Sequence, residues 1–225
     1  MKAAMLSESG LIIGEAPKPE IKPNEILVRV RAAALNRADL LMSDGRMHGK
    51  LGGAGAIAGL EWAGEVAEIG SDAAEFKPGE RVMCSGAGGY AEYAATDWGR
   101  ASPVPAADMS FEHAATLPIA LQTMHDALVG NGRLRAGETV LIQGASSGVG
   151  LMGLQIAKYL GVTFRTRSIE EVREINRNMR ADLWPAVQDG TLHLPLDRVF
   201  PLAEAAAAQD HMRANAHLGK IVLTV

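Results

Sequence analysis

A turn of small residues stands between an apolar run and an apolar-faced helix near the middle of the chain. The apolar run reads TVLIQ, and the helix that follows the turn reads GVGLMGLQIAKYL. Small residues let the backbone approach a ligand, and the free amides and dipole at a helix N-terminus favour an anion. The order of strand, turn and helix therefore predicts a site for the pyrophosphate of a dinucleotide. The residues expected to form it are Ala145, Ser146, Ser147, Gly148, Val149 and Gly150.

A literal G-x-G-x-x-G pattern at Gly148, Gly150 and Gly153 does not define this site. These glycines fall inside the predicted helix, after the turn that must approach the phosphates. An alanine and a serine therefore take the first two glycine places of the motif. A tight strand-to-helix turn that binds nothing is the alternative interpretation.

Arg165 and Arg167 follow the glycine turn by about twenty residues. An arginine at this distance can accommodate the 2′-phosphate of NADP, so both are candidate cofactor residues. The competing interpretation is that they alternate with apolar residues on an exposed edge strand.

The sequence shows no pattern typical of a metal site. Cys84 is the only cysteine, which excludes an internal disulfide and a cysteine-rich zinc site and fits a reducing cytoplasm. It lies in an apolar run, where we expect a buried, unreactive thiol. No helical spacing suited to one ion relates the six histidines, which are His48, His113, His125, His193, His211 and His217.

The elements that must position these residues change in character along the chain. Residues 1–126 carry short alternating runs separated by turns, so a β-rich front part is expected, with Leu27, Val28 and Val30 facing a core. Helices are expected around Pro118, from about 148 to 160, and from Ser168, where Ser168 and Glu171 form a capping box. The apolar stripe expected on this last helix is Ile169, Val172, Ile175, Met179 and Leu183. The segment 162–167 is expected to be a strand. An alanine-rich helix around 203–214 and a closing strand KIVLTV complete the chain.

Composition is that of an ordinary globular protein. Hydrophobic residues make up 48% and charged residues 21% of the 225 residues, and the formal net charge is −4. An acidic chain offers no basic field for nucleic acid or anionic lipid, and no run is long and apolar enough to span a bilayer. We therefore expect a cytoplasmic protein with no nucleic-acid or membrane partner.

Seven stretches touch most of the chain, and their order is specific. They are AALNRADLLMSDGRMHG, GLEWAGEVAEIG, KPGERVM, GGYAEYA, AATLPIALQTMHDAL, GASSGVGLMGLQIAK and ANAHLGKIVLTV. Together they resemble the zinc-less quinone oxidoreductases, which are medium-chain dehydrogenases/reductases related to zeta-crystallin. The resemblance implies a mixed α/β fold, with a GroES-like β-barrel domain and a truncated Rossmann-like βαβ unit. The parts expected are residues 1–126 of the GroES-like domain, residues 127–184 of the nucleotide-binding domain, and residues 185–225 returning to the first domain.

This resemblance implies hydride transfer from NADPH to a quinone or an activated enone, with Asn36 and Thr123 as the catalytic residues near the nicotinamide. A turn-capping Asn and an ordinary helical Thr are the alternatives on residue type alone. Zinc-dependent relatives carry their ligands at the places that match Asn36, Leu60 and Ile119, none of which is a normal zinc ligand. Met47 stands where many relatives have a tyrosine.

The resemblance also implies that about a hundred residues of the nucleotide domain are missing between Leu160 and Val162. A longer protein, a deletion product and a new compact fold are all open explanations. In relatives the strand that matches Val162 to Arg167 pairs two subunits, which implies a homodimer. The rival function class is a non-catalytic remnant that serves as a folding or interaction module.

Overall fold

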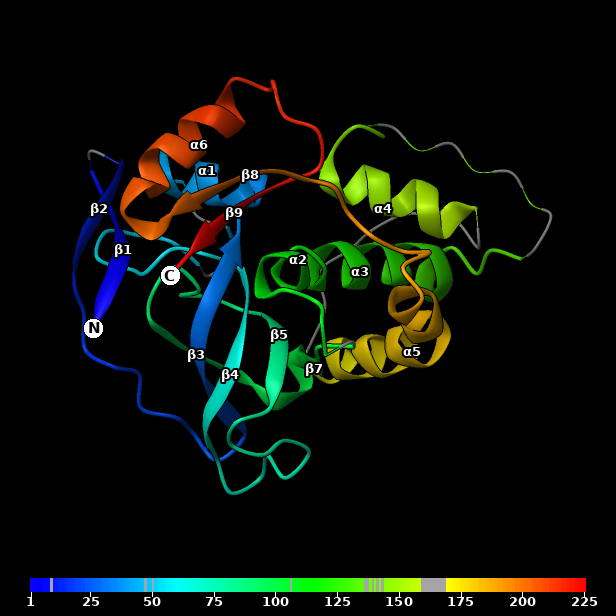
Figure 1. Cartoon of the computed structure of the whole chain (residues 1–225), viewed down its shortest axis with the longest axis horizontal. Coiled ribbons are helices and arrows are strands. Elements are labelled where there is room, and N and C mark those ends of the chain that lie inside the picture. The colour runs from blue at the N-terminus through cyan, green and yellow to red at the C-terminus, as the bar shows by residue number, and fades with distance from the viewer. Residues whose placement is uncertain are drawn as a thin grey trace.

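The structure is a computed structural model that describes most of the chain. It shows a sheet-rich half and a helix-rich half, with both termini in the sheet-rich half (Figure 1). The described residues are 1–8, 10–46, 48–49, 51–105, 107–135, 138, 140, 142, 144–158 and 169–225. The strands are β1 (Lys2–Ser7), β2 (Gly10–Glu15), β3 (Glu25–Ala34), β4 (Glu61–Ile69), β5 (Arg81–Ser85), β6 (Tyr93–Asp97), β7 (Ala101–Pro103), β8 (Leu196–Pro201) and β9 (Lys220–Thr224). The α-helices are α1 (Arg37–Ser43), α2 (Phe111–Ala115), α3 (Pro118–His125), α4 (Gly148–Ala157), α5 (Ile169–Gln188) and α6 (Ala205–Arg213).

The main sheet joins strands from the two ends of the chain. Its strand order is β7-β5-β4-β3-β9-β8, and β6 also pairs with β3. The long strand β3 is antiparallel to β4 along most of its length, and β9 pairs with its last three residues, Ala32 to Ala34. The closing strand β9 therefore lies between β3 and the edge strand β8, in a sheet built mainly by the first half of the chain.

The prediction for β3 is confirmed in part. Leu27, Val28 and Val30 are at most 3% exposed and Arg29 is exposed, but Leu27 and Val28 are adjacent and point to opposite faces of the strand. One core lies under this sheet and contains Trp62 and Tyr90, both fully buried. Both faces of β3 are therefore buried along part of its length, and not one face alone.

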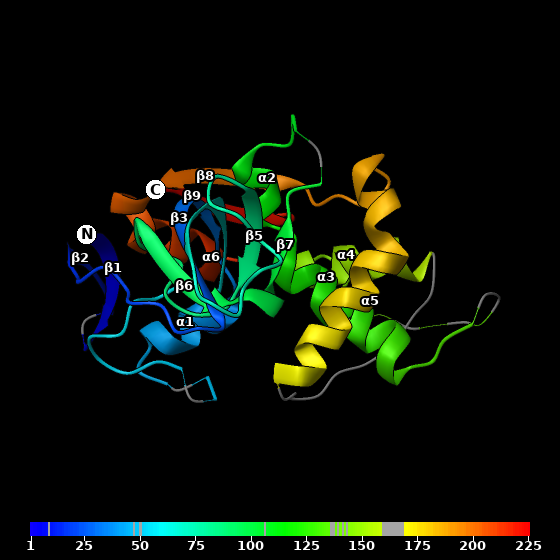
Figure 2. The ribbon, with the colours of Figure 1, turned by 90° about the horizontal axis from the view of Figure 1, so that it is seen from below.

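The helix-rich half has its own core, formed by α2, α3, α4 and α5 with the inner ends of the strands. Met179 and Leu183 of the predicted apolar stripe are fully buried on α5. At Gly153 of α4, an added Cβ would lie 2.4 Å from the end of Met124 on α3, so these two helices pack closely. Figure 2 shows α5 lying across this group, beside the end of the sheet that carries β7.

A buried polar network fastens α5 to the sheet. Asn176, 2% exposed, donates to the carbonyls of Ala101 (2.8 Å) and Gly99 (3.3 Å). Its Oδ1 accepts from Ser102 at 3.0 Å and from Gln122 at 3.4 Å. Each polar atom of this side chain therefore has a partner, as burial requires.

The mixed α/β fold is confirmed, and three of the predicted helical segments are present in it. The predicted helix from 148 ends at Ala157, the alanine-rich helix is α6, and Pro118 begins α3 as its first residue. In the predicted strand 139–143, three residues lie outside the described residues. The same holds for all of 159–168, including the predicted strand 162–167 and the serine of the capping box. The expected domain boundary at 184 falls inside α5, and the division into domains stays a prediction.

No helix within the described ranges has the length and apolar character that crossing a membrane requires.

Candidate functional site

Asn36 lies at the N-terminus of α1, where its side chain is held between two buried charges. Its Nδ2 donates to Glu61 Oε1 at 3.0 Å, and its Oδ1 accepts from Lys220 Nζ at 3.2 Å. Asn36 as a residue is half-buried. Its side chain therefore has a defined direction at a position that is not sealed in the core.

The two charges form an ion pair inside the sheet. Glu61, at the start of β4, is fully buried, and Lys220, at the start of β9, is 4% exposed. Lys220 Nζ donates to Glu61 Oε1, while the other carboxylate oxygen accepts from the backbone N–H of Ile119 at 2.9 Å. Burial of a carboxylate and an ammonium group is tolerated because each is paired and hydrogen-bonded.

Asp39 is a buried carboxyl group that contacts the backbone of Asn36. Its Oδ2 accepts from the Asn36 backbone N–H at 2.7 Å and from the Tyr90 hydroxyl at 3.0 Å. Burial is the main cause that raises the pKa of Asp39 from 3.8 to about 7, and the nearby Glu61 carboxylate acts in the same direction. The hydrogen bonds from Asn36 and Tyr90 and the charge of Lys220 act in the opposite direction. The site thus contains a carboxyl group that titrates close to neutral pH.

The predicted phosphate turn is present just before α4. Gly144 has φ +67°, a backbone conformation that glycine adopts without strain. Ser147 caps the helix: its Oγ accepts from the Gly150 N–H at 3.0 Å and donates to the Gly144 carbonyl at 2.8 Å. A Cβ at Gly150 would lie 2.2 Å from the Gly144 oxygen, so the turn and helix are in contact.

These features fit a bound phosphate group. The first amides of α4, at Gly148 and Val149, have no acceptor within the helix and face its positive end. Ser146 and Ser147 are exposed, and Ala145 is half-buried. The Ser147 hydroxyl is occupied by capping, so it contributes to the shape of the turn more than to binding.

Lys220 connects this turn to Asn36. A Cβ at Gly148 would lie 2.8 Å from Lys220 Cδ, so the lysine side chain packs against the first residue of α4. Ser147 also pairs with Gly219 in a parallel bridge, and Figure 1 shows the segment before β9 passing beside the start of α4. The sequence-predicted turn and Asn36 are therefore brought together.

Thr123 lies on α3, half-buried, one helical turn after Ile119. Residues four apart share a face of a helix, so Thr123 lies on the same face of α3 as Ile119. No hydrogen bond joins its side chain to Asn36 among the described residues. Arg165, Arg167 and Met47 lie outside the described residues.

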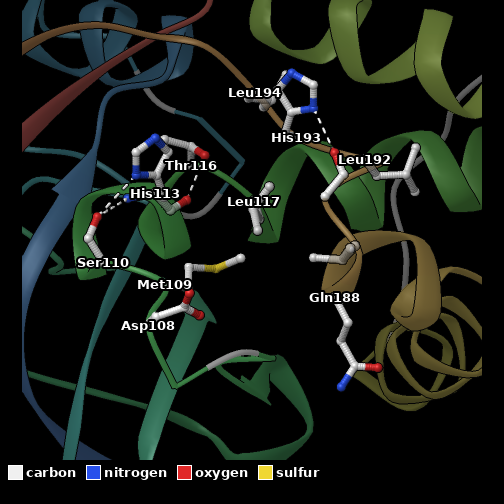
Figure 3. A pocket seen from close by; sticks show the side chains of 12 residues that line it. Asp108, Met109, Ser110, His113, Thr116, Leu117, Gln188, Leu192, His193 and Leu194 are labelled. Carbon is white, nitrogen blue, oxygen red and sulfur yellow. Dashed lines mark hydrogen bonds between the residues drawn. The ribbon is translucent and has the colours of Figure 1, made fainter.

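A separate hollow of about 470 Å³ lies between α2 and the end of α5. Figure 3 shows His113 and Ser110 on one side of it and Gln188 and Leu192 on the other. None of the residues predicted from the sequence as site residues lines it.

The charged part of this site was missed by sequence reasoning. Glu61 and Lys220 each stand in a run that is otherwise apolar, GLEWAG and GKIVLTV. A single charge in a run that should be buried is a signal, because buried charges require a partner. The partner itself could not be read from the sequence, since the two residues are 159 positions apart.

Two protein-family profiles match this chain. Residues 22–106 match the family profile described as "Alcohol dehydrogenase GroES-like domain", and residues 85–223 match that described as "Zinc-binding dehydrogenase". The second match covers more than half of the chain. The chain belongs to the medium-chain dehydrogenase/reductase family of oxidoreductases, which these two domains define.

Similar curated proteins are much longer than this chain. It is 39% identical over 158 residues to the spectinabilin polyketide synthase system protein NorB of Streptomyces orinoci. It is 36% identical over 162 residues to the highly reducing polyketide synthase cla2 of Cladosporium cladosporioides. These matches cover 68% and 72% of the chain but 7% and 6% of the relatives, so the chain spans a small part of them.

Solved structures share the fold along the whole chain. A probable oxidoreductase from Mycobacterium abscessus is 25% identical with a TM-score of 0.85, and the match covers 100% of this chain and 99% of that one. The quinone oxidoreductase from Coxiella burnetii is 22% identical with a TM-score of 0.81, covering 100% and 99%. CurK enoyl reductase is 21% identical with a TM-score of 0.82, covering 99% and 98%.

The family name raises the question of a zinc ion, and the residues present do not fit one. The side chains of Leu60 and Ile119 have no donor atom, and the Asn36 amide is engaged by Glu61 and Lys220. No group of three His, Cys, Asp or Glu side chains suited to a metal occurs in the part of the chain that the structure describes. An ammonium group already neutralises the buried carboxylate.

Proposed function

We propose that this chain is a zinc-independent reductase that uses NADPH to reduce a quinone or an activated enone. The observation that carries the proposal is the Lys220 side chain, which touches both the clamped Asn36 amide and the first residue of α4. A polar group with a fixed direction thus lies beside a turn that fits a dinucleotide phosphate.

In this proposal, Ala145, Ser146, Ser147, Gly148, Val149 and Gly150 hold the pyrophosphate. NADPH supplies the hydride when it is bound, and the chain's task is to position it and the substrate. Asn36 and Thr123 are the residues proposed to face the nicotinamide and the reacting carbon. The proposal also assigns Arg165 and Arg167 to the 2′-phosphate of NADPH.

Among activated enones, an α,β-unsaturated thioester is the substrate class we favour. Polyketide synthases are among the similar curated proteins, and a solved neighbour is named an enoyl reductase. Another solved neighbour is named a quinone oxidoreductase, which keeps a quinone as the second candidate acceptor. The proposed homodimer through Val162 to Arg167 is independent of this choice.

The test is NADPH oxidation by protein whose intact mass of 23.7 kDa has been confirmed. A 2-enoyl thioester and a simple quinone are compared as acceptors, and NADPH binding is followed separately by its fluorescence. Asn36→Ala should lower turnover, while the matched variant Asn178→Ala, at an exposed position on α5, should not. Protein of this mass with neither binding nor turnover would contradict the enzyme proposal and favour a non-catalytic module.

A further inference from the structure

Lys220 is a buried cation whose three donors are all in use. Its Nζ donates to Glu61 Oε1, to Asn36 Oδ1 at 3.2 Å and to the Leu35 carbonyl at 3.4 Å. An ammonium group has three donors and no acceptor, so none is left over for a ligand. In this arrangement, any effect of Lys220 on a ligand must pass through its neighbours.

The neighbour that can reach a ligand is Asn36. Its amide oxygen faces the ammonium group and its amide nitrogen faces the carboxylate of Glu61. Turning the amide over would place its N–H groups against Lys220 and its oxygen against Glu61, so the charges fix its direction. One Nδ2–H is used by Glu61, and the second has no acceptor among the described residues. The half-buried amide is therefore presented as a hydrogen-bond donor.

We propose that Lys220 and Glu61 are positioning residues that hold the Asn36 amide as a directed donor to the bound cofactor or substrate. This inference rests on the proposed function, since it assigns a ligand to the free donor. The ligand atom it suits is an acceptor oxygen, such as a ribose hydroxyl or the carbonyl of the electron acceptor.

Lys220 also determines the position of the Asn36 amide relative to the phosphate turn. Its stem packs on Gly148, where an added Cβ would lie 2.8 Å from Cδ, and Gly219 pairs with Ser147. A shift of α4 would therefore disturb Lys220, and through it Asn36. The ion pair thus connects the cofactor turn to the donor that faces the reaction.

The buried ion pair of Glu61 and Lys220 is not explained by a gain in the stability of the fold. A buried ion pair is often no more stabilising than well-packed apolar residues of similar volume, whereas removing one partner is strongly destabilising. The test therefore removes both charges together in Glu61→Gln/Lys220→Met. The matched control is Lys18→Met/Glu68→Gln, which removes a lysine–glutamate pair whose side chains are 46% and 54% exposed.

The first measurement is the effect of Asn36→Ala on kcat/KM in each background. In the native protein and in the control, loss of one ligand hydrogen bond should lower kcat/KM by about threefold to tenfold. In the paired Glu61/Lys220 variant, Asn36 has already lost its direction, so the same change should cost less than about twofold. An equal loss in all three backgrounds would overturn the proposal, because Asn36 would then act independently of the ion pair.

The second measurement needs no activity. The side-chain amide resonances of Asn36 should be dispersed and exchange slowly in the native protein and the control, and move toward solvent-exposed values in the paired variant. Unchanged amide resonances in the paired variant would overturn the positioning role, even in an active enzyme. Native protein without turnover would contradict the proposed function, but it would not affect the conclusion from the amide resonances. If the paired variant does not fold, Glu61→Gln/Lys220→Gln carries both measurements, because it removes both charges and keeps hydrogen-bonding groups that can satisfy the Asn36 amide in either direction.

Discussion

Replacing Asp39 with asparagine should remove a pH dependence of stability that the native protein has. Asp39 is fully buried, and burial raises the pKa of its carboxyl group from 3.8 to about 7. Asparagine resembles the protonated form: its oxygen can still accept from the Asn36 N–H and the Tyr90 hydroxyl. The variant therefore keeps the shape of the site and loses the titration.

The sign follows from the direction of the shift. Between pH 4 and 7, about the unfolded and folded pKa values of Asp39, the folded state holds a proton that the unfolded state has released. The free energy of unfolding therefore falls as pH rises through this window and is constant above it. Each pKa unit corresponds to about 1.4 kcal/mol, so the loss from about pH 5 to about pH 8 is at most about 3 kcal/mol.

Urea unfolding followed by tryptophan fluorescence at these two pH values measures the effect. The free energy of unfolding of the native protein should fall, relative to that of Asp39→Asn, by up to about 3 kcal/mol on going to the higher pH. The control is Asp210→Asn, at a side chain that is 75% exposed, which should follow the native protein. If the difference in free energy of unfolding between native protein and Asp39→Asn is the same at both pH values, the reasoning is refuted.

Three further changes test the turn, the helix contact and the thiol. Gly150→Ala places a Cβ against backbone atoms of the turn and should weaken NADPH binding in a fluorescence titration, whereas Gly153→Ala meets only side-chain ends, of Met124 and Ile142, and should bind nearly as the native protein does. Asn176→Ala leaves two backbone carbonyls without a donor and should lower the free energy of unfolding by about 2–3 kcal/mol in urea; a loss under about 0.5 kcal/mol would contradict the buried network. Burial raises the pKa of the Cys84 thiol well above its usual range, so it should react with a disulfide reagent only after denaturation, and rapid labelling of folded protein would contradict this.

The elements that the sequence predicted well are those whose pattern is local. The apolar stripe of α5 depends on residues a few positions apart, and its members Met179 and Leu183 are fully buried as expected. The Gly/Ser turn is local too, because Ser147 caps the helix that it precedes. Gly144, whose positive φ makes the turn, stands one residue before the six predicted site residues and was not among them.

The charged part of the site depends on contacts that no local pattern contains. Asn36 was predicted from its resemblance to a family position, but its direction is set by Glu61, 25 positions away, and Lys220, 184 positions away. Sequence alone identifies these as charges in apolar runs, and only the pairing of β3 with β4 and β9 makes them neighbours. A search for charges of opposite sign in apolar runs would have suggested Glu61 and Lys220 as a pair. It would not have shown where in the fold the two residues meet.

This dependence makes the site a property of the assembled sheet. Glu61 and Asn36 belong to the first third of the chain, and the phosphate turn lies beyond its middle, yet the residue that joins them begins the closing strand β9. Until β9 pairs with β3, Glu61 is a carboxylate facing an apolar interior without its cation, which is costly. Correct pairing of β9 therefore both removes this penalty and fixes the Asn36 amide, so the energetics of completing the sheet and the geometry of the site are coupled.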